Sequence, residues 1–305
     1  MKVAVYISGL NRIGGVESFA INLCNRTGWD LIFYEADIKA LSKVKNNFYK
    51  YGYHKKEYDV VILATVWKPH PSDIVLKAKK YVQMVHADYE AYIDGWNFKY
   101  IKYPFTTHHV AVGDHVAKQF EKVTNFKIDK IINNLLEPYN PKKIKSDKLS
   151  FVTLSRFSKE KGFERIIQLA ELMKDEDYVW NIYGDTTTAY AKTVIPRLQQ
   201  YKQINILGVT NTAKDEICKH DYLVQLSDTE GFPYCVYESL QCLTPVITTD
   251  YPSVHELIKD GQNGYILDMQ LSNFCINKIK NIPLIKSFKE KSTEKDWFNF
   301  INEIL

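Results

Sequence analysis

Two glutamates in the segment Glu230-Gly-Phe-Pro-Tyr-Cys-Val-Tyr-Glu238 are the residues of this chain best placed to do chemistry. At about 100° per residue, helical positions eight apart lie roughly 80° out of alignment, so the two carboxylates do not form one helical stripe. Gly231 and Pro233 favour a loop, which leaves Glu230 at the end of a strand and Glu238 inside the following helix. Two groups that only accept hydrogen bonds suit a ligand rich in hydroxyls. The alternative is an ordinary strand, turn and helix with two solvated carboxylates.

Two cations occur earlier, in Phe151-Val-Thr-Leu-Ser-Arg-Phe-Ser-Lys-Glu-Lys-Gly162, where an expected strand ends. Arg156 and Lys161 lie five positions apart, and Gly162 then opens an expected helix. Fixed positive charges at such an edge can hold a diphosphate and stabilise the charge that develops on it as it leaves. The alternative is that both side chains are solvated surface residues.

His86 and Asp88 stand at the end of an expected strand in the first half of the chain. Open α/β sheets bind ligands at this carboxyl edge. Either side chain could take a proton as a general base, and a structural histidine is an equal alternative from the residues alone.

The segment Asn11-Arg-Ile-Gly-Gly-Val-Glu17 follows the first expected strand and opens a helix. Gly14 and Gly15 would let the backbone approach an anion at the helix N-terminus. Because the segment lacks both the dinucleotide fingerprint and the Walker pattern, a simple tight turn explains it equally well.

Together these motifs resemble those of the retaining glycosyltransferases of family four, the glycosyl transferases group 1, which have the GT-B fold. The glutamate segment resembles the family's E-x7-E signature, and the Arg156 segment resembles its G-R-x5-K-G element with Ser155 in place of the usual Gly. Ser239 and Leu243 are further departures, at positions where many members have Ala and Gly.

The resemblance implies a role for each motif. The first glutamate would lie near the hydroxyls of the donor sugar and the second would hold the ribose, while the two cations and the early glycines would meet the diphosphate. The histidine would lie beside the transferred sugar. The implied catalytic residues are His86, Arg156, Lys161 and Glu230, and the implied donor-binding residues are Gly14, Gly15, Arg156, Lys161, Glu230, Gly231, Phe232, Pro233, Tyr234, Cys235 and Glu238.

Strand-like runs alternate with helical patterns almost throughout, which predicts parallel sheets covered on both faces. The expected strands are 3–8, 30–34, 60–64, 81–86, 109–112, 130–133, 149–154, 179–183, 204–207, 222–225, 245–248 and 264–267. We expect an α/β fold of the GT-B type, in which two Rossmann-like doubly wound domains face a central cleft. Residues 1–138 would form the acceptor-side domain, 139–150 a linker, 151–295 the nucleotide-sugar domain, and 296–305 a terminal helix that packs back towards the N-terminal domain.

Composition limits the class of protein. The 305 residues, of which 45% are hydrophobic, suffice for two medium domains with their own cores. The five cysteines form no C-x-x-C pair, and their odd number without a secretory leader predicts reduced thiols in the cytosol. No run approaches the ~20 apolar residues of a membrane span. We therefore expect a cytoplasmic protein with no metal site and no cofactor beyond its nucleotide-sugar substrate.

Positive charge is concentrated in the first half, with a net charge of +5 over residues 1–138 and −1 over residues 139–305. Lysines are mixed with aromatic residues in 39–56, and a second such run covers 96–105. These mixtures favour peripheral binding to an anionic membrane surface, and the alternative is a solvated lysine-rich face whose tyrosines cover the core. The near-neutral second half and the lack of an RNA-binding signature argue against nucleic acid as a partner.

The sequence therefore predicts a retaining, metal-independent hexosyltransferase. It would move a hexose or N-acetylhexosamine from a nucleotide diphosphate sugar, most simply a UDP-sugar, to a glycan or lipid-linked acceptor in cell-surface polysaccharide biosynthesis. Retention is implied by the resemblance, and no nucleophile is evident on the opposite face, which favours front-face displacement. The alternatives are a UDP-sugar epimerase and a non-catalytic partner subunit that only binds the nucleotide sugar.

Overall fold

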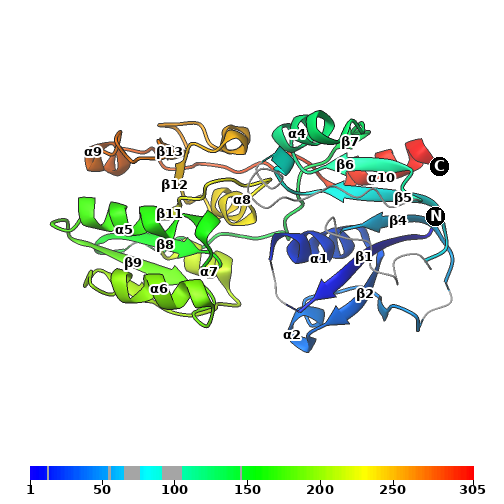
Figure 1. The fold of residues 1–305 in the computed structure, drawn as a ribbon, viewed down its shortest axis with the longest axis horizontal. Helices are drawn as coiled ribbons and strands as arrows, with labels where there is room; N and C mark the ends of the chain where they lie inside the picture. Colours follow the sequence, from blue (N-terminus) through cyan, green and yellow to red (C-terminus); the bar gives the residue numbers. More distant parts are fainter. Residues whose placement is uncertain (12–13, 54–55, 65–75, 91–104, 145) are drawn as a thin grey trace. The chain divides into compact units, whose positions relative to one another are not determined.

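The computed structural model describes residues 1–305 except 12–13, 54–55, 65–75, 91–104 and 145 (Figure 1). The chain forms two compact units, of which unit 1 comprises Met1–Glu137 and Glu290–Leu305 and unit 2 comprises Pro138–Lys289. The segment expected as a linker therefore counts with unit 2. The chain returns to unit 1 at residue 290, whereas the sequence predicts that the second domain continues to residue 295 and that the returning helix begins at residue 296.

In the described part of unit 1, seven parallel strands form one sheet in the order β3-β2-β1-β4-β5-β6-β7. The bounds are β1 Val3–Leu10, β2 Asp30–Ala36, β3 Phe48–Lys50, β4 Tyr58–Leu63, β5 Ala78–Val85, β6 His108–Ala111 and β7 Lys130–Ile131. The expected strands of this half are present, and β3 is an additional one. β3 has only three residues and lies at the edge of the sheet, and its lysine and aromatic residues do not show a strand pattern in the sequence.

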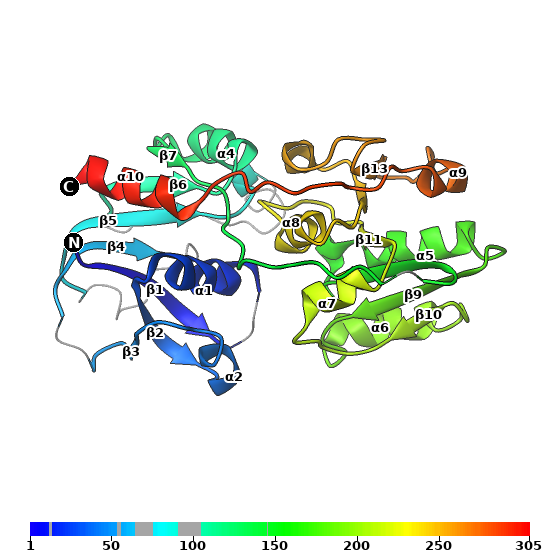
Figure 2. The ribbon, with the colours of Figure 1, turned by 180° about the vertical axis from the view of Figure 1, so that it is seen from behind.

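The helices of unit 1 include α1 Gly15–Thr27, α2 Ile38–Leu41, α4 Asp114–Thr124 and α10 Glu294–Ile304. Thr293 precedes α10, and its N–H donates to the Asp296 carboxylate at 2.7 Å, which closes a capping box. Trp297 of α10 packs against Phe19 of α1, with ring centroids 6.2 Å apart, so the two helices lie side by side (Figure 2). The C-terminal helix is thus part of the core of unit 1.

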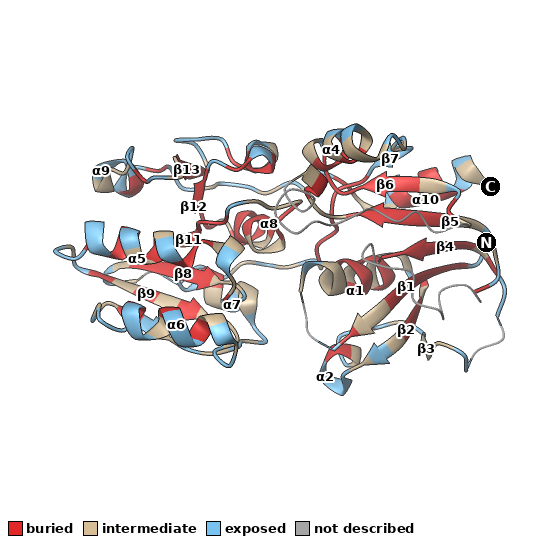
Figure 3. Cartoon of the chain, in the orientation of Figure 1, coloured by how far each residue is buried: buried red, intermediate tan, exposed pale blue. Residues whose placement is uncertain are grey.

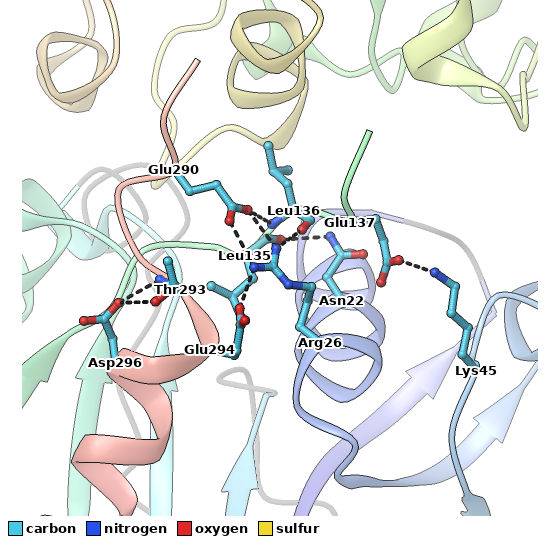
Figure 4. Close-up of polar contacts among 10 residues, drawn as sticks. All are labelled: Asn22, Arg26, Lys45, Leu135, Leu136, Glu137, Glu290, Thr293, Glu294 and Asp296. Carbon is cyan, nitrogen blue, oxygen red and sulfur yellow. Dashed lines mark hydrogen bonds and ion pairs between the residues drawn. The ribbon is translucent and has the colours of Figure 1, made fainter. Parts of the chain in front are cut away.

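Arg26 of α1 holds both segments through which the chain leaves and re-enters unit 1 (Figure 4). Its guanidinium donates to the Leu136 carbonyl oxygen and forms ion pairs with Glu290 at 2.9 Å and Glu294 at 2.5 Å. The Leu136 N–H also donates to the Glu290 carboxylate at 3.1 Å. One arginine therefore fixes where the outgoing and returning segments meet unit 1.

Unit 2 contains a sheet of six parallel strands in the order β10-β9-β8-β11-β12-β13 over its described residues. The bounds are β8 Leu149–Leu154, β9 Tyr178–Tyr183, β10 Ile204–Ile206, β11 Tyr222–Gln225, β12 Val246–Thr249 and β13 Gly264–Leu267. From β8 the chain first builds β9 and β10 on one side, and then crosses to β11, β12 and β13 on the other. The order therefore reverses between β8 and β11, which is the kind of switch point where open α/β sheets bind ligands.

The helices of unit 2 are α5 Phe163–Leu172, α6 Ala189–Leu198, α7 Ala213–Cys218, α8 Tyr234–Gln241 and α9 Ile276–Lys280, with the 3₁₀ turns η2 Lys159–Lys161 and η3 Pro252–Glu256. Helices α5 and α6 lie against each other, as do α7 and α8. Because parallel crossovers are right-handed, the two directions of strand progression place α5 and α6 on one face and α8 on the other. The predicted fold of two Rossmann-like domains is confirmed.

Buried residues line the central strands of both sheets, while exposed residues lie on the outer sides of the helices (Figure 3). In unit 2 the Trp180 indole N–H donates to the Thr153 hydroxyl at 3.0 Å, and that hydroxyl donates to the Val224 carbonyl oxygen at 2.8 Å. These buried polar groups link β9, β8 and β11, and so align the two strands on either side of the switch point.

None of the helices in the described ranges has both the length and the apolar character that crossing a membrane requires.

The two departures near α8 have structural reasons. Leu243 has φ +56, a left-handed conformation that favours glycine, which is the residue many relatives are expected to carry there. Ser239 is buried, and its hydroxyl donates to the Thr244 carbonyl oxygen at 2.8 Å while the Thr244 N–H donates back to the Ser239 carbonyl oxygen at 2.9 Å. The serine therefore closes the turn after α8 where an alanine would not.

Gly162 joins η2 to α5 and touches the end of β11. It has φ +69, and a Cβ at this position would lie 1.7 Å from the Leu226 carbonyl oxygen. This close contact sets the distance between the segment that follows β8 and the segment that follows β11.

We predict that Gly162→Ala destabilises unit 2 much more than Gly261→Ala. Gly261 has φ +71, but a Cβ there would meet no atom within 4 Å, so its replacement costs only about 1–2 kcal/mol of left-handed strain. Gly162→Ala adds a clash with backbone, for which we expect a total loss of about 4 kcal/mol or more in unfolding free energy. Urea denaturation of both variants measures the difference, and equal losses would contradict this account of the junction.

Candidate active site

Three donors hold one oxygen of the Glu230 carboxylate. Oε1 accepts hydrogen bonds from Lys161 Nζ at 2.6 Å, Gln225 Nε2 at 2.8 Å and Ser227 Oγ at 2.8 Å. Over the described residues, none of the hydrogen bonds to this carboxylate uses Oε2. The side chain is thus held through one oxygen, and the second oxygen is the one a ligand can use.

Lys161 and Glu230 form a largely buried ion pair, with side-chain exposures of 15% and 11%. Burial lowers the pKa of Lys161, but the charge and hydrogen bond of Glu230 outweigh it and the net pKa is raised. Lys161 therefore stays charged at neutral pH. Its ammonium group has three N–H donors, so the bond to Glu230 leaves further donors for a phosphate.

Arg156 follows β8 and is 71% exposed, with its guanidinium 3.8 Å from the Glu160 carboxylate. Its positive charge acts to lower the pKa of Lys161, against the larger raising effect of Glu230, so the two cations lie near each other. A planar guanidinium at a strand end suits a phosphate group, to which it can donate two parallel hydrogen bonds. In this structure Arg156 is the accessible cation, and Lys161 is engaged with Glu230.

The segment between Glu230 and Glu238 forms the expected loop and helix. α8 begins at Tyr234 with Pro233 as its N-cap residue, and Pro233 has no side-chain group that caps the helix. Such a helix start favours a negatively charged group. Glu238 lies on the same helix, one turn after its start.

Cys235 lies among the charged side chains of the segment. Burial raises the pKa of its thiol to about 12, with further upward contributions from Glu230 and Glu238 and an opposing one from Lys161. These contributions require that all three charged groups are close to one thiol. The structure thus brings both glutamates and Lys161 to one edge of the sheet, as the sequence predicts, and leaves Cys235 as an unreactive thiol.

The position of this cluster follows from the sheet topology. Arg156 and Lys161 come after β8, and Glu230 comes after β11, so they flank the point where the strand order reverses. All the parallel strands end at this edge, and the polar groups that follow them converge there.

His86 follows β5 in unit 1, and its ring packs edge-on against Phe19 with centroids 4.7 Å apart. The ring hydrogen-bonds the Ala64 backbone, and Nε2 is buried without a hydrogen-bond partner among the described residues. The bond to Ala64 is therefore made by Nδ1. Burial lowers the pKa of His86 to about 4. At neutral pH the ring is thus uncharged, and Nε2 is a hydrogen-bond acceptor.

Asp88 is buried, and its Oδ2 lies 2.9 Å from Nε2 of His115 on α4. The carboxylate is thus part of a contact within unit 1. This leaves His86 as the better candidate of the two for contact with a ligand.

The early glycine loop is described only in part, because residues 12 and 13 lie outside the described ranges. Gly14 N–H donates to the Glu17 carboxylate at 2.9 Å, and Gly15 is the first residue of α1. The role of both glycines in diphosphate binding stays a prediction.

Some residues of the lysine and aromatic segment 39–56 of unit 1 contact other side chains, and others are exposed to solvent. Lys56 contacts Asp30 at 3.0 Å and the Tyr49 hydroxyl at 2.7 Å, and Tyr51 packs against Tyr6. These contacts agree with the interpretation that tyrosines cover the core. Ile38, Phe48 and Tyr53 nevertheless remain exposed. Lys55 and most of the second aromatic run, residues 96–104, lie outside the described ranges.

Sequence reasoning missed three buried residues around Glu230, namely Gln225, Ser227 and Tyr251. Gln225 ends β11, Ser227 follows it, and Tyr251 follows β12. For Gln225 and Ser227 the sequence holds only a weak signal, namely polar residues at the end of an apolar strand just before the glutamate motif. No sequence pattern marks Tyr251.

We predict that His86 makes unit 1 less stable in acid. Its pKa is lower in the folded chain than in the unfolded chain, so protons favour the unfolded state between about pH 6.5 and 4. The unfolding free energy should fall through this window by up to about 3 kcal/mol. Urea denaturation at pH 7.5 and pH 4.5 should show a smaller fall in His86→Gln than in the parent or in the control His255→Gln, whose side chain is 60% exposed. Identical pH dependence in all three would show that His86 does not carry the effect.

Residues 139–282, which include all the unit 2 site residues named above, match the family described as glycosyl transferases group 1. Among curated relatives, an uncharacterized 41.2 kDa protein of the cps region of Klebsiella pneumoniae is 22% identical over 242 residues, covering 78% of this chain and 65% of that protein. The N-acetyl-alpha-D-glucosaminyl L-malate synthase of Bacillus anthracis is 22% identical over 158 residues, covering 50% of this chain and 42% of that enzyme. The chain thus spans less than two thirds of the length of either relative.

Among solved structures, Anabaena HepE in complex with UDP and glucose is similar over 100% of this chain and 99% of that chain, with a TM-score of 0.73 and 14% identity. At this identity the likeness establishes the two-domain GT-B architecture. The family match shows that residues 139–282 of this chain belong to the glycosyl transferases group 1.

Proposed function

We propose that the chain is a retaining, metal-independent hexosyltransferase that moves a hexose or N-acetylhexosamine from a UDP-sugar to a glycan or lipid-linked acceptor in cell-surface polysaccharide biosynthesis. The observation that carries the proposal is the Lys161–Glu230 pair at the switch point of unit 2, with Arg156 at the neighbouring strand end.

The similar proteins support the choice of donor and process. HepE has been solved both with UDP and glucose and with UDP-glucose. The Klebsiella relative comes from a cps region, and the Bacillus relative is named as the synthase of N-acetyl-alpha-D-glucosaminyl L-malate. A UDP-sugar donor and a glycan product are the simplest extension to this chain.

The unit 2 site suits each part of such a donor. Arg156, the remaining donors of Lys161 and the start of α8 bind the diphosphate, and Glu238 accepts from the ribose hydroxyls. Glu230 Oε2 accepts a hydrogen bond from a hydroxyl of the sugar.

In the proposed reaction, the bond between the anomeric carbon and the diphosphate oxygen breaks as the acceptor oxygen bonds to the same face of that carbon. Negative charge grows on the leaving diphosphate, where fixed cations stabilise it by several kcal/mol. The acceptor proton passes to a diphosphate oxygen. These cations supply the positive charge that a metal ion provides in other transferases, so the proposed step is metal-independent.

His86 acts in this proposal as a hydrogen-bond acceptor from a sugar hydroxyl. With its pKa lowered to about 4, the imidazole is a weak base at neutral pH. A weak base is a poor proton acceptor from a hydroxyl, which favours the leaving diphosphate for that step.

We also propose that unit 1 binds an anionic membrane surface on its cytoplasmic side. Lys39 lies beside the exposed Ile38, and Lys50 lies near the exposed Tyr53, with Nζ 5.9 Å from its ring. Exposed apolar side chains next to lysines suit the boundary between lipid headgroups and acyl chains.

For the transfer reaction, we predict that the purified protein in EDTA releases UDP from one member of a UDP-sugar panel, with release increased by a lipid-linked glycan extract. Glu230→Gln retains an oxygen for the three donors but turns the second acceptor into a donor, so it should lower turnover by about 100-fold or more with little change in UDP affinity. Arg156→Ala should lower turnover and UDP affinity by about tenfold each. Glu164→Gln serves as the control, because Glu164 is a surface carboxylate paired with Arg197.

Parent-like turnover in both Glu230→Gln and Arg156→Ala would refute the site assignment. UDP binding without release from any donor, even with the acceptor extract, would favour the non-catalytic partner subunit. Formation of an epimerised UDP-sugar without UDP release would favour the epimerase.

For the membrane surface, we predict that the protein binds liposomes containing phosphatidylserine and that binding falls as salt is raised, because the attraction is screened. The double variant Lys39→Glu/Lys50→Glu should bind severalfold less than Lys192→Glu/Lys202→Glu, which makes the same charge change on exposed lysines of unit 2. Liposome co-sedimentation measures this, and salt-insensitive binding or equal binding of the two variants would refute the proposal.

A further inference from the structure

Tyr251 and Gln225 form a buried connection that ends on the Glu230 carboxylate. The Tyr251 side chain is fully buried, and its hydroxyl lies 3.2 Å from Gln225 Oε1. Gln225 is 5% exposed, and its Nε2 lies 2.8 Å from Glu230 Oε1. The connection joins the ends of β12 and β11 beneath the site.

Chemistry fixes the direction of both hydrogen bonds. A carboxylate only accepts hydrogen bonds, so the Gln225 side chain must turn its NH₂ group towards Glu230 and its oxygen towards Tyr251. Burial, followed by the nearby charge of Glu230, raises the pKa of Tyr251 well above its ordinary value. The phenol therefore keeps its proton and donates it to the amide oxygen.

The connection also decides which carboxylate oxygen meets a ligand. With Lys161, Gln225 and Ser227 all donating to Oε1, that oxygen has no capacity for a further donor. If the amide of Gln225 turned over, its oxygen would face a carboxylate oxygen and the side chain of Glu230 would be displaced. The Tyr251 hydroxyl prevents this by satisfying the amide oxygen on the far side.

We propose that Gln225 and Tyr251 are positioning residues that act through Glu230 and set which hydroxyl of the donor sugar is recognised. The inference rests on the proposed function, because it needs Glu230 to contact the sugar of a UDP-sugar. Neither residue touches the donor. Their role is to hold Oε2 in one place, so that it accepts from a sugar hydroxyl of one configuration and discriminates against the epimer.

The test compares binding of UDP, UDP-glucose and UDP-galactose by calorimetry in the full chain, together with kcat and KM for the donor that is turned over. Gln225→Met keeps the length of the side chain but cannot donate, and should reduce the preference between the two epimeric donors by about tenfold, the usual effect of losing a hydrogen bond to a charged group. Tyr251→Phe should act in the same direction with a smaller effect. Affinity for UDP alone should change less than twofold in both, and kcat should fall more than KM changes.

Tyr222→Phe is the matched control for a lost buried phenol. Tyr222 begins β11, is buried, and donates to the Ile279 carbonyl oxygen at 2.7 Å, away from Gln225. The Tyr222→Phe variant should lose about as much stability as Tyr251→Phe and should keep the parent's preference between the two donors. This separates positioning from a general effect on the fold.

Unchanged donor preference in Gln225→Met and Tyr251→Phe would overturn the inference while leaving the proposed function intact. So would an equal loss of affinity for UDP and both UDP-sugars. A parent chain that binds neither UDP nor either UDP-sugar would instead contradict the proposed function, and the inference with it.

Discussion

The ion pair between Lys161 and Glu230 is the interaction on which the candidate site depends. Two charged side chains with exposures of 15% and 11% are costly to bury unless each satisfies the other, and breaking such a pair leaves an uncompensated charge. The pair joins the segment after β8 to the segment after β11, the two strands between which the order of the sheet reverses. It therefore fixes both a structural junction and the place where a negatively charged, hydroxyl-rich ligand can bind.

The backbone around this pair is built for close approach. Gly162 brings the start of α5 against the Leu226 carbonyl, and Arg165 donates to the same carbonyl from Nε at 3.0 Å. Gly184, at the end of β9, is similarly tight, since a Cβ there would lie 2.3 Å from the Ser155 carbonyl oxygen. Packing at this edge thus leaves little freedom for the loops that present the charged groups, which lowers the reorganisation needed when a ligand binds.

Much of this could be predicted from the sequence, because strand periodicity and the glutamate and cation motifs are local patterns. The alternation of apolar runs gave the parallel sheets, and glycine and proline after Glu230 gave the loop before α8. Other features depend on distant contacts. The three donors to Glu230 come from two strand ends, Lys161 from the segment after β8 and the other two from the end of β11. No local sequence pattern predicts that Gln225 or Ser227 faces Glu230. The sequence does not predict strand β3, because three exposed or half-buried residues at a sheet edge have no distinctive period. The placement of Lys161 on Glu230 also required the structure, since spacing alone suggested a free cation.

The most direct test of the central claim is hydrogen–deuterium exchange of the full chain with and without UDP. If the donor site lies at the switch point of unit 2, UDP should slow exchange in the segments 155–163 and 226–238, at the ends of β8 and β11, and leave the segment 143–148 unchanged. Slower exchange confined to other parts of unit 2, or none at saturating UDP, would contradict the assignment of this edge as the nucleotide-sugar site.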